Sequence, residues 1–172
     1  MELTQNPSVL ELVQKTAELT TPKEIVWIDG SEAQLESLRK IAVETGELIK
    51  LNEEKLPGCY LNRSDVNDVA RVEGRTFICS RTREEAGPTN NWMDPDEMKA
   101  KLHEILRCAM AGRTMYVIPY SMGVIGSPFA KYGIEVTDSI YVVLNMAIMT
   151  RIGTKVLDAL GDSSDVILGV HS

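Results

Sequence analysis

The chain has 172 residues, enough for one domain with a substantial apolar core. Its 25 acidic and 18 basic residues give a net charge of −7, which argues against a nucleic-acid-binding surface, since such a surface needs a basic footprint. No apolar run approaches the ~20 residues that a membrane-spanning helix needs. The first residues also lack the basic and apolar regions of a secretion signal. We therefore expect neither nucleic acid nor a membrane as a partner.

Capping residues and apolar periodicity predict the elements of the first third of the chain. Asn6 and Pro7 form a cap and first-turn pair that opens a helix. Ser31 with Gln34 forms a capping box that opens a second helix. The alternation of helices and strands favours an α/β layer fold. In chain order, the predicted elements are a helix from Pro7 to Pro22, a buried strand over 24–28, a helix from Ser31 to Gly46 and a short strand over 48–51.

The same signals predict the rest of the chain. Asp94 and Pro95 open a helix whose inward face is formed by Met98, Leu102, Ile105 and Leu106. The segment from Ser139 fits a strand or a helix, and its spacing favours a helix that ends at Gly153. The other predicted elements are a loop-rich stretch over 52–70, a short strand over 76–79, an exposed loop over 81–92, strands over 114–118 and 134–136, a short helix over 154–160 and a strand over 165–171. We predict an α/β fold with a mixed β-sheet flanked by helices, in a single domain.

The cysteines and histidines do not suggest a metal site. The three cysteines, Cys59, Cys79 and Cys108, are widely spaced and odd in number, so they fit neither a zinc spacing nor a disulfide framework. A reducing, cytoplasmic setting is the simplest interpretation, with all three as structural thiols. His103 lies on a predicted helix among charged residues, where we expect it to be solvated, and His171 stands near the last residue. No metal ligands are therefore predicted.

One cluster of arginines could bind an anion. A guanidinium suits phosphate or carboxylate because its planar fork donates two parallel hydrogen bonds. Strand geometry would place Arg71 and Glu73 on one face, although a surface ion pair is the alternative interpretation. The cluster consists of Arg63, Arg71, Arg75, Arg81 and Arg83.

The loop over residues 121–128 is rich in Gly, Ser and Pro and follows a predicted strand. It lacks the Lys-Ser/Thr ending of a phosphate-binding loop, so a tight structural turn is the favoured interpretation. No nucleophile is paired with a base anywhere in the sequence, so no catalytic residue is predicted.

Several long blocks closely resemble GTP-dependent phosphoenolpyruvate carboxykinases. The motif GPTNNW is more similar to the prokaryotic branch of that family. Three departures from the family pattern, at Tyr120, Val124 and Ile152, affect packing or turn stiffness and leave the charge unchanged. The blocks are DVARVEGRTFICS (68–80), PTNNWMDP (88–95), GRTMYVIPYSMGVIGSP (112–128), TDSIYVV (137–143) and MAIMTRIGTKVL (146–157).

The resemblance implies roles for two residues and a reaction for the whole family. Arg71 would contact the anionic substrate, phosphoenolpyruvate or oxaloacetate, and Glu73 would help to hold a mobile lid closed. Family members convert oxaloacetate and GTP to phosphoenolpyruvate, GDP and CO₂ in gluconeogenesis, with Mn²⁺ at the site. The family's metal ligands, phosphate loop and guanine pocket correspond to sequence beyond residue 172. We therefore expect residues 1–172 to be the N-terminal, substrate-side domain without its nucleotide-binding C-terminal half.

This interpretation carries further expectations. The isolated chain should bind neither Mn²⁺ nor GTP and should have no carboxykinase activity. A domain separated from its partner should also expose an apolar face or an open sheet edge. Two alternatives remain: a stand-alone, non-catalytic module that binds small anions or regulates, and an unrelated structural α/β domain.

Overall fold

The computed structural model describes residues 2–64 and 72–172. The chain divides into two compact units. The larger unit comprises Met1–Arg63 and Cys108–Ser172, and the smaller unit comprises Ser64–Arg107. The smaller unit is therefore inserted in sequence between two segments of the larger one.

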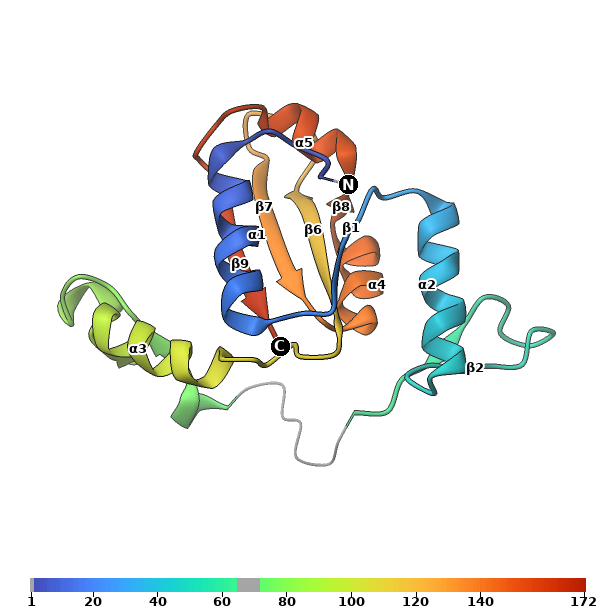
Figure 1. The fold of residues 1–172 in the computed structure, drawn as a ribbon, viewed down its shortest axis with the longest axis horizontal. Helices are drawn as coiled ribbons and strands as arrows, with labels where there is room; N and C mark the ends of the chain where they lie inside the picture. Colours follow the sequence, from blue (N-terminus) through green and yellow to red (C-terminus); the bar gives the residue numbers. More distant parts are fainter. Residues whose placement is uncertain (1, 65–71) are drawn as a thin grey trace. The chain divides into compact units, whose positions relative to one another are not determined.

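The larger unit is built on a five-stranded mixed sheet (Figure 1). The strand order is β1-β6-β7-β9, and the short β8 pairs with β6 beyond the end of β1. β6 runs parallel to β1 and antiparallel to β7 and β8, and β9 runs parallel to β7. The bounds are β1 Glu24–Trp27, β6 Thr114–Met122, β7 Lys131–Thr137, β8 Arg151–Ile152 and β9 Ile167–His171.

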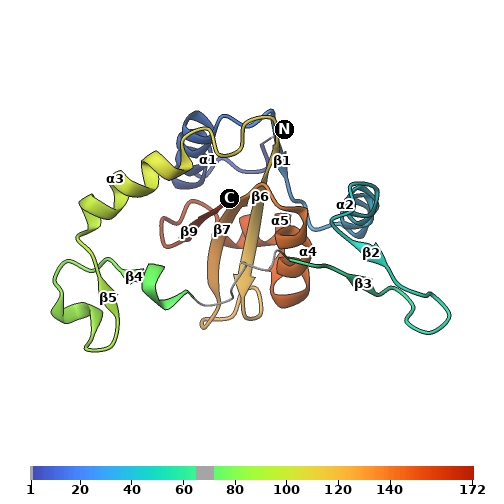
Figure 2. The same ribbon diagram turned by 90° about the horizontal axis from the view of Figure 1, so that it is seen from below.

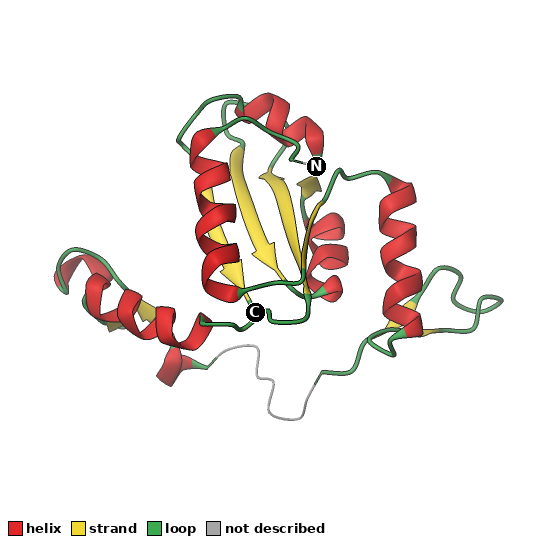
Figure 3. Cartoon of the chain, viewed as in Figure 1, coloured by secondary structure: helices red, strands yellow, loops and turns green. Residues whose placement is uncertain are grey.

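Helices cover both faces of this sheet (Figures 1 and 3). On one face, α1 (Pro7–Thr20) and α5 (Thr154–Leu160) pack on a core that includes Met115 and Val117 of β6. On the other, α2 (Glu32–Glu44) and α4 (Ile140–Met149) pack on Tyr116 and Ile118 of the same strand. Successive residues of a strand point to opposite faces, so β6 supplies both cores. The predicted α/β fold with a mixed sheet flanked by helices is confirmed.

The predicted helix caps form, with one correction. The Asn6 side chain accepts hydrogen bonds from the amides of Ser8 and Val9, and it donates to the carbonyls of Gly161 and Ser163. It thus caps α1 and ties that helix to the end of α5.

Ser31 caps α2 by accepting from the amide of Gln34 at 3.2 Å. The capping box is only half formed, however. The Gln34 side chain bonds the amide of Asp29, and an Asp29 carboxylate oxygen takes the amide of Ser31.

The ends of two predicted elements need correction. β1 stops at Trp27 and lies at an edge of the sheet, so Ile25 is 39% exposed and the strand is not fully buried. α4 ends at Met149, where the chain turns into β8 to pair with β6, so the predicted continuation to Gly153 is wrong.

The segment expected to be loop-rich contains a strand. β2 (Ile49–Lys50) pairs in antiparallel fashion with β3 (Tyr60–Leu61), with the predicted turn at Pro57-Gly58 between them. Figure 2 shows this pair beside α2. The cysteines also differ from expectation. All three are free and exposed, so none of them packs in the core as a structural thiol would be expected to.

Two backbone segments of the larger unit cross in direct contact. A Cβ atom built on Gly30 would lie 2.5 Å from the carbonyl oxygen of Ile152, and one built on Gly153 would overlap the carbonyl of Asp29. Both glycines also have positive φ angles, of 79° and 104°. The amide of Thr154 donates to the Asp29 carbonyl at 3.1 Å across this crossing. The end of β1 is thereby fixed to the start of α5.

The smaller unit has short elements and little apolar burial. β4 and β5 pair in parallel, so the predicted exposed loop over 81–92 contains a strand at its end. The expected inward face of α3 is wrong as well, because α3 has no buried residue and Ile105 is 72% exposed. The elements are η1 (Glu73–Arg75), β4 (Phe77–Ile78), η2 (Glu84–Ala86), β5 (Asn91–Trp92) and α3 (Pro95–Leu106).

β9 forms one edge of the described sheet, pairing with β7 on its other side. Its apolar residues Ile167, Leu168 and Val170 are exposed. This agrees with the expected open sheet edge. Among the described residues, no helix has the length and apolar character needed to cross a membrane.

Candidate functional site

Of the two predicted site residues, the structure describes Glu73 and does not describe Arg71. Because Arg71 lies outside the described residues, its role remains a prediction from the sequence. Of the other arginines in the predicted cluster, Arg75, Arg81 and Arg83 are exposed on the smaller unit, and Arg63 is exposed on the larger unit.

Glu73 is exposed and opens the 3₁₀ helix η1. The expected strand geometry is therefore wrong at this residue. The carbonyl of Val72 accepts hydrogen bonds from the amide of Arg75 and from the hydroxyl of Thr76, at 3.0 and 2.8 Å, and these bonds turn the chain. Glu73 lines a cavity of about 710 Å³, which is also lined by Val72, Gly74, Thr76, Thr89, Asn90 and Asn91.

Side-chain amides hold the backbone around this cavity. Asn91 donates to the carbonyls of Glu73 and Thr76, at 2.6 and 3.2 Å, so it ties η1 to β5. Asn90 donates to the carbonyl of Ala86 at 2.7 Å. These structural amides were missed by the sequence reasoning. The signal available was the pair of adjacent asparagines, whose short side chains readily bond nearby backbone groups.

The described lining of this cavity does not by itself bind an anion. Glu73 is the only charged residue among the described lining residues, and its carboxylate would repel a phosphate or carboxylate. An anion placed there would need a cation from another part of the chain. Arg71 stands two residues before Glu73 in the sequence.

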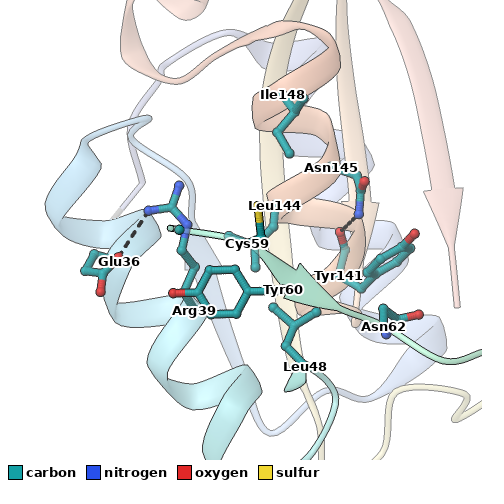
Figure 4. Close-up of a pocket in the computed structure, with 11 residues that line it drawn as sticks. Glu36, Arg39, Leu48, Cys59, Tyr60, Asn62, Tyr141, Leu144, Asn145 and Ile148 are labelled. Carbon is teal, nitrogen blue, oxygen red and sulfur yellow. Dashed lines mark hydrogen bonds and ion pairs between the residues drawn. The ribbon is translucent and has the colours of Figure 1, made fainter. Parts of the chain in front are cut away.

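A second cavity, of about 540 Å³, lies within the larger unit between α2, the β2–β3 pair and α4 (Figure 4). Its apolar lining includes Leu48, Leu144 and Ile148, and two tyrosines contribute from β3 and α4. The polar lining residues are Glu36, Arg39, Asn62, Tyr60, Tyr141 and Asn145.

The charge of the second cavity is largely neutralised. Arg39 pairs with both Glu32 and Glu36, the latter at 3.2 Å. Hydrogen bonding to Glu32 is the main cause that raises the pKa of Arg39. Of these three residues, Arg39 and Glu36 line the cavity, so their opposite charges balance there.

The predicted structural turn is present, although its first two residues, Ser121 and Met122, belong to β6. Residues 123–130 connect β6 to β7 in an antiparallel hairpin, whereas a phosphate-binding loop would lead into a helix. The amide of Ser127 bonds the carbonyl of Val124 at 3.0 Å, and the amide of Gly126 bonds the Tyr132 hydroxyl at 2.9 Å.

The two histidines belong to different units. His103 is exposed on α3, and Nδ1 of His171 lies 3.0 Å from the hydroxyl of Thr137. In the parts of the chain that the structure covers, no three residues among His, Cys, Asp and Glu are grouped to hold a metal ion.

Tyr120, Glu135 and His171 lie on one face of the sheet. The strand register places Glu135 opposite Gly169 and Tyr120 opposite Gly133, and each larger side chain lies over the facing glycine. Glu135 is half-buried, and this burial raises the pKa of its carboxyl, while the charge of His171 opposes the rise. Burial also raises the pKa of Tyr120.

Known proteins resemble this chain over almost its whole length. Residues 11–172 match the family model described as the phosphoenolpyruvate carboxykinase N-terminal domain. A phosphoenolpyruvate carboxykinase (GTP) from Corynebacterium kroppenstedtii is 54% identical over 169 residues, which are 98% of this chain and 27% of the relative. One from Neocallimastix frontalis is 52% identical over 97% of this chain and 28% of its own length. One from Chlamydia pneumoniae is 50% identical over 93% of this chain and 27% of its own length. The chain thus spans just over a quarter of the length of these curated relatives.

Proposed function

The chain belongs to the family of phosphoenolpyruvate carboxykinase N-terminal domains, and from this we propose that it is the substrate-side part of a GTP-dependent phosphoenolpyruvate carboxykinase. The complete enzyme would convert oxaloacetate and GTP to phosphoenolpyruvate, GDP and CO₂, in the cytoplasm and in gluconeogenesis. The observation that carries this proposal is the identity of 54% to a phosphoenolpyruvate carboxykinase (GTP) across 98% of the chain.

Arg71 is the proposed contact for the substrate anion. A guanidinium can grip a carboxylate or phosphate with two parallel, charge-assisted hydrogen bonds. Such a grip fixes the anion while it reacts, which lowers the barrier through positioning and electrostatic stabilisation. Glu73 is the proposed lid contact, because it is exposed, lines a cavity and is available to a segment that closes over it.

Asn91 gives Glu73 a fixed place. By bonding the carbonyls of Glu73 and Thr76, it holds the short η1 turn from which the carboxylate projects. In the proposed enzyme this turn would present Glu73 to a lid. The carboxylate would accept hydrogen bonds from the lid, so its loss would weaken closure rather than chemistry.

The chemistry of phosphoryl transfer would come from the rest of the enzyme. GTP and Mn²⁺ would bind the nucleotide-binding C-terminal half, where the metal would neutralise charge on the transferring phosphoryl group. The described residues of this chain offer no group of ligands for that metal. The 172-residue chain alone is therefore proposed to be inactive.

A domain exchange tests the proposal. Residues 1–172 would replace the matching segment of the Corynebacterium kroppenstedtii relative, and GTP-dependent decarboxylation of oxaloacetate would be measured with Mn²⁺ present. We expect the chimera to be active and the isolated chain to be inactive. Arg71→Ala in the chimera should lower kcat/KM by about a hundredfold or more, as expected for a lost anion contact.

Matched controls separate the proposed roles from general damage. Arg81→Ala removes an exposed arginine of the same unit and should leave kcat/KM within about twofold. Glu73→Gln should lower activity, whereas Glu84→Gln, at the equivalent first position of the 3₁₀ helix η2, should not. Equal losses in Arg71→Ala and Arg81→Ala, or full activity in both, would refute the assignment of Arg71.

A further inference from the structure

The strand β9 forms an open edge of the sheet in the larger unit (Figures 1 and 2). One side of β9 pairs with β7 over five residues, and within the described part of the chain no strand pairs with its other side. Alternate backbone groups of an edge strand point away from its neighbour. β9 therefore presents a row of amide and carbonyl groups that a further strand can bond.

The side chains of this edge are apolar on both faces of the sheet. Leu168 and Val170 point to the face that α1 covers, and Ile167 points to the opposite one, because successive residues of a strand alternate. Leu168 and Val170 are 45% and 37% exposed, and Ile167 is 52% exposed. An exposed apolar edge of this kind is a surface on which another strand pairs.

The other edge of the sheet, formed by β1, has a different character. Lys23 and Glu24 are charged and exposed at its start, and Pro22 precedes them. Lysine, other charged residues and proline are devices by which natural proteins prevent an edge strand from pairing. β9 has the sequence ILGVH, which contains no proline, lysine or acidic residue. Of the two edges, β9 is therefore the one suited to take a further strand.

A hollow of about 370 Å³ beside β9 supports the same conclusion. It lies between α1 and the start of β9, and its lining includes Leu12 of α1 together with Val166 and Leu168. Every second side chain of a strand next to β9 would extend over this face of the sheet. Apolar side chains in those positions would fill the hollow and remove its apolar lining from water.

The added strand is expected to come from the same protein and not from a second copy. A pair of five-residue strands forms few hydrogen bonds, and each contributes little net free energy. Two separate molecules must also lose translational and rotational freedom when they associate. A strand joined to β9 through the chain avoids most of that cost, since the linkage gives it a high effective concentration. This chain spans 27% of the Corynebacterium kroppenstedtii relative, so the proposed enzyme has further sequence that can supply the strand.

We propose that the free edge of β9 is the docking site for a β-strand from the part of the enzyme that lies beyond residue 172. The backbone of that strand extends the sheet by one position, and its apolar side chains cover Leu168 and Val170 and fill the hollow beside α1. This inference rests on the proposed function, because it takes the added strand from the complete carboxykinase. It adds the surface through which main-chain hydrogen bonds join the substrate-side part to the rest of the enzyme.

Hydrogen exchange of the β9 amides tests the proposal. Mass spectrometry of the peptide over 166–172 compares the isolated chain with the domain-exchange chimera described above. In the isolated chain, the amides that point to the free edge should exchange nearly as fast as those of an unstructured peptide. In the chimera they should exchange at least about a hundredfold more slowly, because exchange then requires the added strand to separate. The peptide over 24–27, from the β1 edge, is the control and should exchange equally in both proteins.

A matched pair of variants locates the docking surface. Val170→Lys in β9 and Ile25→Lys in β1 each place a lysine at a sheet edge, at positions that are 37% and 39% exposed. In the chimera, Val170→Lys should speed exchange of the β9 peptide at least about tenfold, whereas Ile25→Lys should leave it unchanged. Exchange of the central β6 peptide over 114–122 reports whether each variant is folded. If Val170→Lys does not fold, Ile167→Lys on the opposite face repeats the test.

The outcomes separate this inference from the proposed function. Equal exchange of the β9 peptide in the isolated chain and in the chimera would overturn the docking site. Protection in the chimera that grows with protein concentration would show that a second copy covers the edge, which also contradicts the proposal. The activity of the chimera is measured separately. An inactive chimera with a protected β9 refutes the proposed function alone, and an active chimera with a fast-exchanging β9 refutes the docking site alone.

Discussion

The larger and smaller units of this chain are held together by different interactions. Nearly all the buried apolar side chains lie in the larger unit, where helices cover both faces of the sheet. Ala86 is the one buried apolar residue that the structure describes in the smaller unit. There, side chains such as Asn91 and Trp92 bond backbone carbonyls instead. Apolar burial specifies one unit, and local polar contacts specify the other.

This difference predicts unequal stability. Burial of apolar surface is the dominant favourable contribution to folding, whereas an exposed hydrogen bond contributes little net free energy. The smaller unit should therefore open locally at a lower free energy than the larger one. The proposed substrate contact Arg71 and lid contact Glu73 both lie in this less stable unit.

The largest effect is expected for Ile118→Ala in β6. Ile118 is fully buried between the sheet and the α2–α4 layer, so the change should cost about 2–5 kcal/mol and lower the melting temperature by about 5–15 °C. Thermal unfolding followed by circular dichroism measures this shift. Phe77→Ala in β4 is the counterpart in the smaller unit, and it should move the main transition far less because Phe77 is only partly buried. Equal shifts would contradict the contrast between the units.

A smaller difference is expected between two helix caps. Asn6→Ala removes the cap of α1 and also both hydrogen bonds to the turn after α5, so it should cost about 2–3 kcal/mol. Asp94→Ala removes only the cap of α3 and should cost about 1 kcal/mol, confined to the smaller unit.

Two tryptophans separate these effects, because Trp27 is buried in the larger unit and Trp92 lies in the smaller one. In a Trp92→Phe background, the fluorescence of Trp27 follows urea unfolding of the larger unit. In a Trp27→Phe background, the fluorescence of Trp92 follows unfolding of the smaller unit. If Asp94→Ala lowered the free energy of unfolding measured through Trp27 as much as Asn6→Ala does, the contrast between the two units would be refuted.

The smallest effect concerns the pH dependence of the larger unit. Burial raises the pKa of Glu135 in the folded chain, so the folded state holds its proton at pH values where the unfolded state has lost it. The stabilising contribution is thus fully present below the ordinary carboxyl pKa and is lost as the pH rises through the raised one. Tyr116, Tyr120 and His171 are further ionisable side chains on this face.

Glu135→Gln should remove this dependence. The variant should melt at a higher temperature than the parent at neutral pH, and the difference should vanish in acid. Glu104→Gln, an exposed carboxylate on α3, is the control and should leave the pH profile unchanged. A constant difference between Glu135→Gln and the parent across the pH range would show that the effect is packing, not titration.

The sequence predicted the elements whose signals are local. Asn6, Ser31 and Asp94 marked three helix starts because a cap acts through its own neighbouring amides. The central strand β6 was expected from its β-branched and aromatic residues, although its full length to Met122 was not.

The missed elements depend on partners that local sequence does not contain. β3, β5 and β8 each have two residues, too few to show any periodicity, and each is defined by its pairing with another strand. The same limit applies to the candidate site. Glu73 was identified through family resemblance, but the 3₁₀ turn that presents it depends on Asn91, eighteen residues further on.

The crossing of Gly30 and Gly153 has a consequence for how this fold can change over time. Neither position admits any side chain, since a methyl group at either one would overlap the other segment's backbone. Two positions that are always glycine show no correlated substitutions. Methods that infer spatial proximity from correlated substitutions would therefore not detect this junction. This close backbone approach would thus leave no trace in evolutionary statistics, and only coordinates reveal it.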